Sequence, residues 1–159
     1  MVSGPTLKQQ LDQRVGELKQ TVAGVSEDKA TARSGEGEWC VKEVLSHLSG
    51  DDHALGMYEF KRFVEEDTPE LGITPGVSYF GPEREKAPVP ELVSTIEEQY
   101  SEIGTFLSGL NDEQLARKAH IAFLKETPVG EYPTLAQWSM AIINFHLPDH
   151  ISQLRTLCQ

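Results

Sequence analysis

Apolar residues recur every three or four positions along four stretches of this chain, which is the spacing of one buried face of an α-helix. The first stretch predicts a helix of roughly 18 residues, whose stripe is Leu7, Leu11, Val15, Leu18 and Val22. The other three predict helices from about Trp39 to Glu66, from near Pro90 or Glu91 onward, and from a cap at Thr134 through Leu157. Four long amphipathic helices and few strand signals favour an all-α four-helix bundle.

The connection between the second and third predicted helices limits their topology. Between Thr68 and Pro90 the chain carries five prolines and three glycines, which oppose a long helix. A connector of about 20 extended residues can span some 65 Å, whereas a helix of about 28 residues is roughly 42 Å long. The connector can therefore return the chain to the far end of the bundle. This favours an up-down-down-up order with a long crossover between helices two and three.

Length and charge narrow the classes of function. The 159 residues fit a single domain over residues 1–159. The net charge of −11 disfavours nucleic acid and anionic membrane surfaces as partners. We find neither an apolar run long enough for a membrane helix nor a signal peptide, and two cysteines are too few for a disulfide framework. We expect a cytoplasmic protein that acts on a small molecule or on another protein.

Three histidines are the candidate metal ligands. His146 and His150 are four residues apart on the last predicted helix, so their imidazoles project from one face. His47, delivered from the second predicted helix, would complete a three-nitrogen site with open coordination positions, as reactive metal centres have. The alternative is three partly buried or surface histidines with no common role. His53 points away from His47 on a helix, and His120 lies in an irregular region, so neither is a candidate.

Other residues near these histidines allow more than one interpretation. On a continuous helix, Asp51 lies one turn after His47, where it could be a fourth ligand, orient an imidazole, act as a general base, or simply face solvent. Pro148 removes the hydrogen bond to the carbonyl of Asn144. The resulting distortion could rotate His150 away from His146, or it could widen the helix near the site. Gln153, one turn beyond His150, could hydrogen-bond into the site or to the backbone.

We expect the aromatic residues of the predicted helices to pack in the core and the charged residues to face solvent. Core packing is the favoured role of Trp39, Tyr58, Trp138 and Phe145. The charged exterior of the second predicted helix includes Lys42 and Glu43. The connectors over residues 68–90 and 112–133 are expected to form the walls of a pocket, since connectors commonly carry specificity.

Two short blocks resemble a known family. The block WCVKEVLSHL, residues 39–48, resembles the opening of helix two in DinB-like proteins, and HLPDHISQL, residues 146–154, resembles the end of their fourth helix. The resemblance implies a four-helix bundle with a long crossover, often assembled as a homodimer. It implies a divalent ion, commonly nickel, zinc or iron, held by His47, His146 and His150. Relatives include thiol-dependent S-transferases, a mycothiol-dependent isomerase and proteins described as metal-dependent hydrolases.

Two functional hypotheses follow from these observations. In the first, the protein is a metal-dependent enzyme in which the ion acts as a Lewis acid and activates either a low-molecular-weight thiol for transfer or water for hydrolysis. In the second, it is a non-catalytic dimeric bundle that binds a ligand or partner protein, and its histidine cluster is structural or vestigial.

Overall fold

The computed structural model describes residues 1–51 and 56–159, and the regular structure of these residues is helical. Over the described ranges, the β-structure consists of isolated bridges that pair Glu70 with His120 and Lys118 with Thr134. The helices are α1 (Gly4–Val22), α2 (Glu27–Thr31), α3 (Val41–Ser49), α4 (Met57–Glu65), α5 (Pro82–Lys86), α6 (Val89–Ser108), α7 (Asp112–Leu115), η1 (Ala122–Leu124), α8 (Leu135–Ala141), η2 (Ile142–His146) and α9 (Leu147–Leu157).

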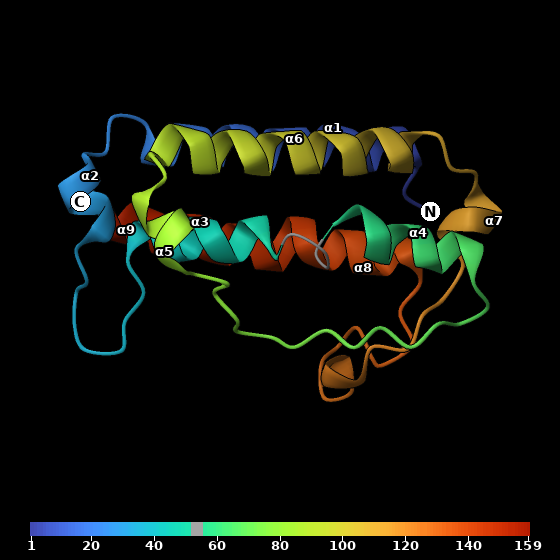
Figure 1. Cartoon of the computed structure of the whole chain (residues 1–159). Coiled ribbons are helices and arrows are strands. Elements are labelled where there is room, and N and C mark those ends of the chain that lie inside the picture. Colours follow the sequence, from blue (N-terminus) through green and yellow to red (C-terminus); the bar gives the residue numbers. More distant parts are fainter. Residues whose placement is uncertain (52–55) are drawn as a thin grey trace.

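The long helices pack in two layers. Figure 1 shows α1 and α6 side by side in the upper layer, and α3 and α4 together with α8 and α9 in the lower layer. Along the chain, α3, α4 and α6 run from left to right in this view, whereas α1, α8 and α9 run from right to left. The connector between α4 and α5 runs back along the length of the bundle. The connector thereby lies across the outside of the lower layer.

Local sequence explains where most helices begin and which faces they bury. The predicted stripe of α1 is confirmed, because all five of its apolar residues are buried in the core. The predicted cap at Thr134 is confirmed as well, because its hydroxyl accepts a hydrogen bond from the Gln137 N–H; Asn111 caps α7 in the same way by accepting one from the Gln114 N–H. Helix α6 begins with Pro90 in its first turn, where a missing N–H costs nothing.

Gly4 allows α1 to approach the backbone of α6 closely. A Cβ atom at Gly4 would lie 2.0 Å from the carbonyl oxygen of Leu107. We expect Gly4→Ala to lower the free energy of unfolding by about 1–3 kcal/mol, because one of the two backbones must move. Gly16, also on α1, has no neighbouring atom within 4 Å of such a Cβ. Gly16→Ala should therefore leave stability unchanged or raise it by up to about 1 kcal/mol; chemical denaturation of both variants measures the contrast.

The prediction of one continuous second helix is wrong. Helix α3 ends at Ser49, and Gly50 follows with φ 70° and ψ −169°, a conformation that residues with a Cβ rarely adopt. The next helix among the described residues, α4, begins at Met57. The predicted helical positions Asp52, His53 and Leu55 lie outside the described residues.

The expected charged exterior of this helix is also partly wrong. Lys42 and Glu43 are only 3% and 5% exposed. Lys42 forms an ion pair with Glu27 at 2.7 Å, and Glu43 pairs with Arg33. Residues that precede α3 in the sequence therefore neutralise its buried charges.

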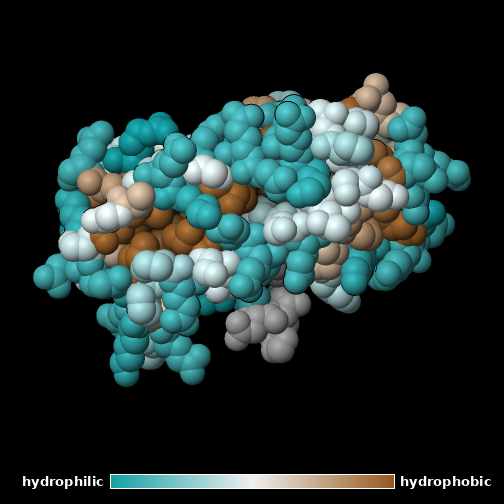
Figure 2. All heavy atoms as spheres, turned by 90° about the horizontal axis from the view of Figure 1, so that it is seen from above, coloured by the Kyte–Doolittle hydropathy of each residue, from teal (hydrophilic) through white to brown (hydrophobic). Residues whose placement is uncertain are grey.

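The face of the molecule seen from above is largely polar. Seen from above, the molecule is mostly hydrophilic, and apolar residues show mainly toward the left end and in smaller areas toward the right (Figure 2). None of the helices in the described ranges has the length and apolar character needed to cross a bilayer.

Candidate metal centre

The helix that carries two of the histidines widens immediately before Pro148. The segment Ile142–His146 is a π-helical turn in which the Leu147 N–H donates to the carbonyl of Ile142, five residues earlier. Proline cannot supply the usual N–H to the carbonyl of Asn144, so a local defect is expected at this point. The widened turn also moves Phe145 out of the predicted core stripe: it is 65% exposed, while Ile143 and Leu147 are buried. The core assignment of Phe145 is therefore wrong.

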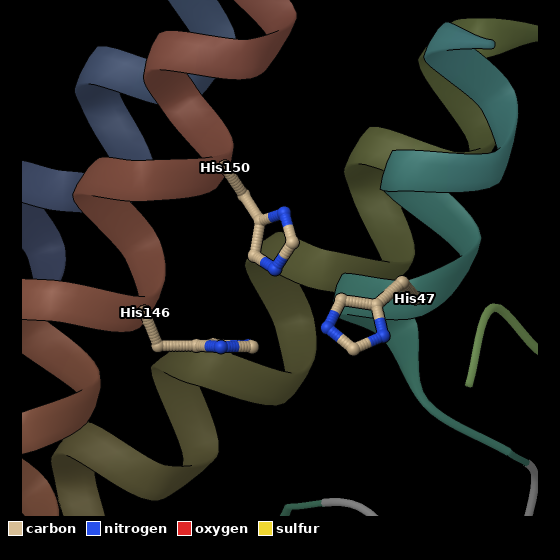
Figure 3. A group of neighbouring side chains, drawn as sticks. All are labelled: His47, His146 and His150. Carbon is tan, nitrogen blue, oxygen red and sulfur yellow. The ribbon is translucent and has the colours of Figure 1, made fainter. Parts of the chain in front are cut away.

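The structure brings the three predicted histidines together. One ring nitrogen of each of His47, His146 and His150 lies within 4.8 Å of the corresponding nitrogen of the other two. The ring centroids are 4.6 Å apart for His47 and His150, 4.8 Å for His146 and His150, and 5.2 Å for His47 and His146. In Figure 3, His47 projects from α3 toward the other two rings, which project from the last helix. Of the two outcomes considered for Pro148, the shared histidine face is retained.

Hydrogen bonds determine which nitrogen two of the rings present. Nδ1–H of His47 donates to the carbonyl of Val77 at 2.6 Å, and Nδ1–H of His150 donates to Oε1 of Gln153 at 2.9 Å. A carbonyl oxygen only accepts, so in both rings Nδ1 carries the proton and Nε2 keeps its lone pair. These are the outer contacts that orient metal-binding imidazoles. The hydrogen bond suggested for Gln153 thus reaches a ring of the cluster.

Burial keeps two rings of the cluster neutral. Loss of solvent, together with smaller contributions from the charges of His150 and His47, lowers the pKa of His146 to about 3. Burial is also the largest cause that lowers the pKa of His47, against the opposing effect of its Val77 hydrogen bond. A neutral imidazole is the form that binds a metal ion. At neutral pH, His146 and His47 are therefore in the protonation state that such binding requires.

Several polar contacts hold α3 in place around His47. Arg84 donates to the carbonyl and the hydroxyl of Ser46 at 2.9 and 3.0 Å. On the other side of His47, the side-chain amide of Gln99 donates to the carbonyl of Ser49 at 2.8 Å. These residues come from α5 and α6, so the position of His47 depends on the packing of three separate segments.

Trp39 packs against the core, as expected, and also forms a wall of the cluster. Its ring is nearly parallel to that of His150, with centroids 6.3 Å apart and an interplanar angle of 14°. Its centroid lies 5.2 Å from that of His47. The indole shields one side of two histidine rings, and its emission should report on events at the cluster.

All three histidines line a cavity of about 490 Å³. This volume is within the range of small-molecule sites. Both expected connectors contribute walls, through Ile73, Thr74, Pro75, Gly76 and Tyr79 from one and Phe123, Leu124, Thr127, Pro128 and Val129 from the other. The prediction that these connectors line a pocket is confirmed. Tyr58, by contrast, is 59% exposed, so its core assignment is wrong.

The two connectors are joined at His120. Its ring contacts the carboxylates of Glu70 and Glu131, one on each connector, and it stacks on Tyr132. The Leu71 N–H also donates to the His120 carbonyl at 2.9 Å. His120 therefore serves to hold the walls of the cavity together, away from the histidine cluster.

Asp51 does not lie where a continuous helix would place it. Helix α3 ends two residues before it, and Asp51 is not among the described residues that line the cavity or that converge with the three histidines. Its charge is felt by Tyr79: burial raises the pKa of the Tyr79 hydroxyl, and the negative charge of Asp51 raises it further. The helical reasoning behind the Asp51 prediction is wrong, whereas its functional role stays a prediction.

Comparisons with known proteins agree on the fold. A family model described as the DinB superfamily matches residues 10–154. Among solved structures, YfiT from Bacillus subtilis matches with a TM-score of 0.78 and 22% sequence identity, covering 99% of this chain and 88% of that chain. YfiT is described as a probable metal-dependent hydrolase with an unusual four-helix bundle topology. No curated protein matches the sequence. At this identity, the likeness to YfiT establishes a shared four-helix bundle fold.

Proposed function

The chain belongs to the DinB superfamily, and on this basis we propose that it is a divalent-metal-dependent enzyme that acts on a small molecule in the cavity. His47, His146 and His150 would hold the ion, His47 and His150 through Nε2. The observation that carries this proposal is the convergence of three ligand nitrogens within 4.8 Å at the wall of a cavity of about 490 Å³. The donor set fits a transition metal or zinc, because imidazole is a preferred ligand of both.

Three protein ligands would leave coordination positions open for a substrate or water. A divalent ion bound there would supply Lewis acidity that lowers the pKa of a water molecule or a thiol. The chain itself contributes the orientation of two imidazoles, through Val77 and Gln153, and apolar walls that exclude water. The separation of the cluster from bulk solvent should strengthen every electrostatic interaction at the site.

Hydrolysis is the reaction that we place first. Supporting it is the description of YfiT, a structural neighbour, as a probable metal-dependent hydrolase. The cavity wall adds an independent reason, because neither Lys nor Arg is found among its described residues. A low-molecular-weight thiol that carries carboxylates would lack a cationic partner there. Thiol transfer is the second candidate, and the non-catalytic bundle remains the alternative if turnover is absent.

Metal analysis combined with a substrate screen tests this proposal. Protein purified without a tag or chelator is analysed for bound metal and then assayed with zinc, nickel or iron. Ester and amide substrates report hydrolysis, and thiols combined with electrophiles report transfer. We expect hydrolytic turnover that depends on metal and is lost in His47→Ala. Stoichiometric metal with transfer alone would favour the second candidate, and the absence of metal under every loading condition would favour the non-catalytic alternative.

Gln153 should control metal affinity without touching the ion. We expect Gln153→Leu to weaken binding of Zn²⁺ roughly 10- to 100-fold, because His150 loses the acceptor that orients its ring. Competition with a chromophoric chelator measures the change. Ser152→Ala, at the exposed neighbouring position on α9, is the matched control and should bind as wild type does. Equal affinities of wild type and Gln153→Leu would remove Gln153 from the site.

Asp51 is retained as a candidate catalytic residue that acts through its charge near the cavity. We expect Asp51→Asn to leave the fold intact and to reduce metal affinity or turnover. Circular dichroism checks the first expectation, and the chelator competition and hydrolysis assays check the second. Wild-type values in both assays would exclude Asp51 from the site.

A further inference from the structure

Two residues that line the same cavity, Glu59 and Trp138, each carry a buried polar atom that has no role in the histidine cluster. Glu59, on α4, lines the cavity, and its Oε2 is buried without a hydrogen-bond partner among the described residues. The nearby cation Arg62 is already occupied, since its guanidinium makes two hydrogen bonds to Glu66, at 2.7 and 3.0 Å. Burial raises the pKa of Glu59, against a smaller lowering by Arg62. An unpaired buried oxygen is costly, which makes Glu59 a candidate ligand-binding group.

Trp138 supplies the complementary atom. Its Nε1–H is buried without an acceptor in the described structure, and its indole lines the cavity. Trp138 and His146 are eight residues apart on successive segments of one long helix, roughly 12 Å along an α-helical axis. The cavity therefore extends beyond the histidines to a free hydrogen-bond donor. A ligand that reaches Trp138 and the cluster together must be elongated.

The charges of the cavity wall favour a cation over an anion. Its acidic lining groups are Glu59 and Asp149, while the described lining residues include neither Lys nor Arg. The net charge of −11 adds to this bias at long range. Most of the remaining wall is apolar, and it includes Phe60, Ile73, Ile103, Phe123 and Val129. The wall thus matches an apolar body that carries a positive charge.

We propose that the substrate class is an amphipathic amine, whose ammonium pairs with Glu59 and whose carbonyl or other acceptor binds Nε1–H of Trp138. The apolar body of the molecule lies against the aromatic and aliphatic walls, and the reacting group faces the three histidines. As a statement about substrate, this rests on the proposed function. Binding of the amine itself requires no metal, so the two proposals can fail separately.

The experiment compares two probes of the same size in the metal-free protein. Phenylalaninamide carries an ammonium and a carbonyl, and 3-phenylpropionamide lacks only the ammonium. We expect phenylalaninamide to bind wild type at least ten-fold more tightly, as measured by calorimetry. In Glu59→Gln this preference should disappear, while the affinity for 3-phenylpropionamide stays as it was. Glu65→Gln, at an exposed position of the same helix, should retain the preference.

The two tryptophans of the chain locate each binding event, because both line the cavity. In Trp39→Phe, emission comes from Trp138 alone, and we expect phenylalaninamide to change it saturably. In Trp138→Phe, emission comes from Trp39 beside His47 and His150, and Ni²⁺ should quench it. The same variant should bind phenylalaninamide several-fold more weakly but lose no affinity for phenethylamine, which has no carbonyl.

Equal affinity of wild type for the two probes would overturn the amine proposal, and this result needs no variant to fold. Undiminished preference in Glu59→Gln, with the fold checked by circular dichroism, would also overturn it. If either result is obtained and Ni²⁺ still quenches the emission of Trp39, the metal proposal stands. Conversely, a selective amine response without any metal response would support an amine-binding bundle and reject the metal-dependent enzyme.

Discussion

His146→Ala should lower the affinity for Zn²⁺ or Ni²⁺ by at least about 100-fold, because loss of a ligand should cost no less than loss of its outer partner. The alanine removes one of three converging nitrogens and leaves a pair that closes only part of the coordination sphere. His47→Ala and His150→Ala should have effects of similar size. Titration of apoprotein with each metal against a competing chelator measures the constants, and elemental analysis gives the stoichiometry.

His120→Ala is the matched control for these variants. His120 is a histidine in contact with two carboxylates, yet it belongs to the junction of the connectors and not to the cluster. We expect the His120→Ala variant to retain one high-affinity ion per chain. Wild-type affinity in His146→Ala, or loss of the ion in His120→Ala alone, would show that metal binds elsewhere.

The metal-free protein should become much less stable in acid. The pKa of His146 is lowered from 6.5 to about 3, with burial as the main cause. Between these two values the unfolded chain takes up a proton at His146 that the folded chain refuses. The free energy of unfolding from this group therefore falls as pH decreases from about 6.5 to about 3, by up to about 1.4 kcal/mol per pH unit. The lowered pKa of His47 acts in the same direction.

Urea denaturation of the apoprotein at pH 7, 6, 5 and 4 measures this slope. In His146→Gln the slope should be smaller by about one proton, because the amide does not titrate. Zinc should raise stability at pH 7, as any ligand of the native state does, and the increase should be absent in the alanine variant. Identical slopes for wild type and His146→Gln would mean that His146 is not held neutral by burial.

Periodicity and capping were enough to predict most of the bundle. The stripe of α1 and the cap at Thr134 depend on interactions within a few residues, which a sequence displays directly. The four-residue spacing of His146 and His150 is local in the same way, and a family resemblance identified the distant partner His47. The grouping of these three rings was therefore predictable in outline.

The incorrect predictions all depended on long-range or backbone geometry. The sequence alone does not show that Gly50 adopts a φ of 70°, which ends α3. The placement of Asp51 one helical turn after His47 is wrong for the same reason. Lys42 was assigned to the exterior because Glu27, the partner that neutralises its buried ammonium, comes from another helix. Phe145 is exposed because the π-helical turn changes the face of the helix on which its side chain lies.

Two features of the site carried no sequence signal at all. The acceptor for His47 is the backbone carbonyl of Val77, and any residue type offers a carbonyl. Likewise, the unpaired oxygen of Glu59 is recognisable only when the cavity and the engaged Arg62 are seen together. The chemistry of this cavity thus depends on contacts between segments that are distant in sequence.

The central claim is that His47, His146 and His150 bind one divalent ion. Anomalous diffraction at the zinc edge, from crystals grown with stoichiometric zinc, tests it most directly. We predict one strong peak at about 2.0–2.1 Å from a nitrogen of each of the three rings. A cluster without a peak, or a peak only between His120, Glu70 and Glu131, would contradict the claim.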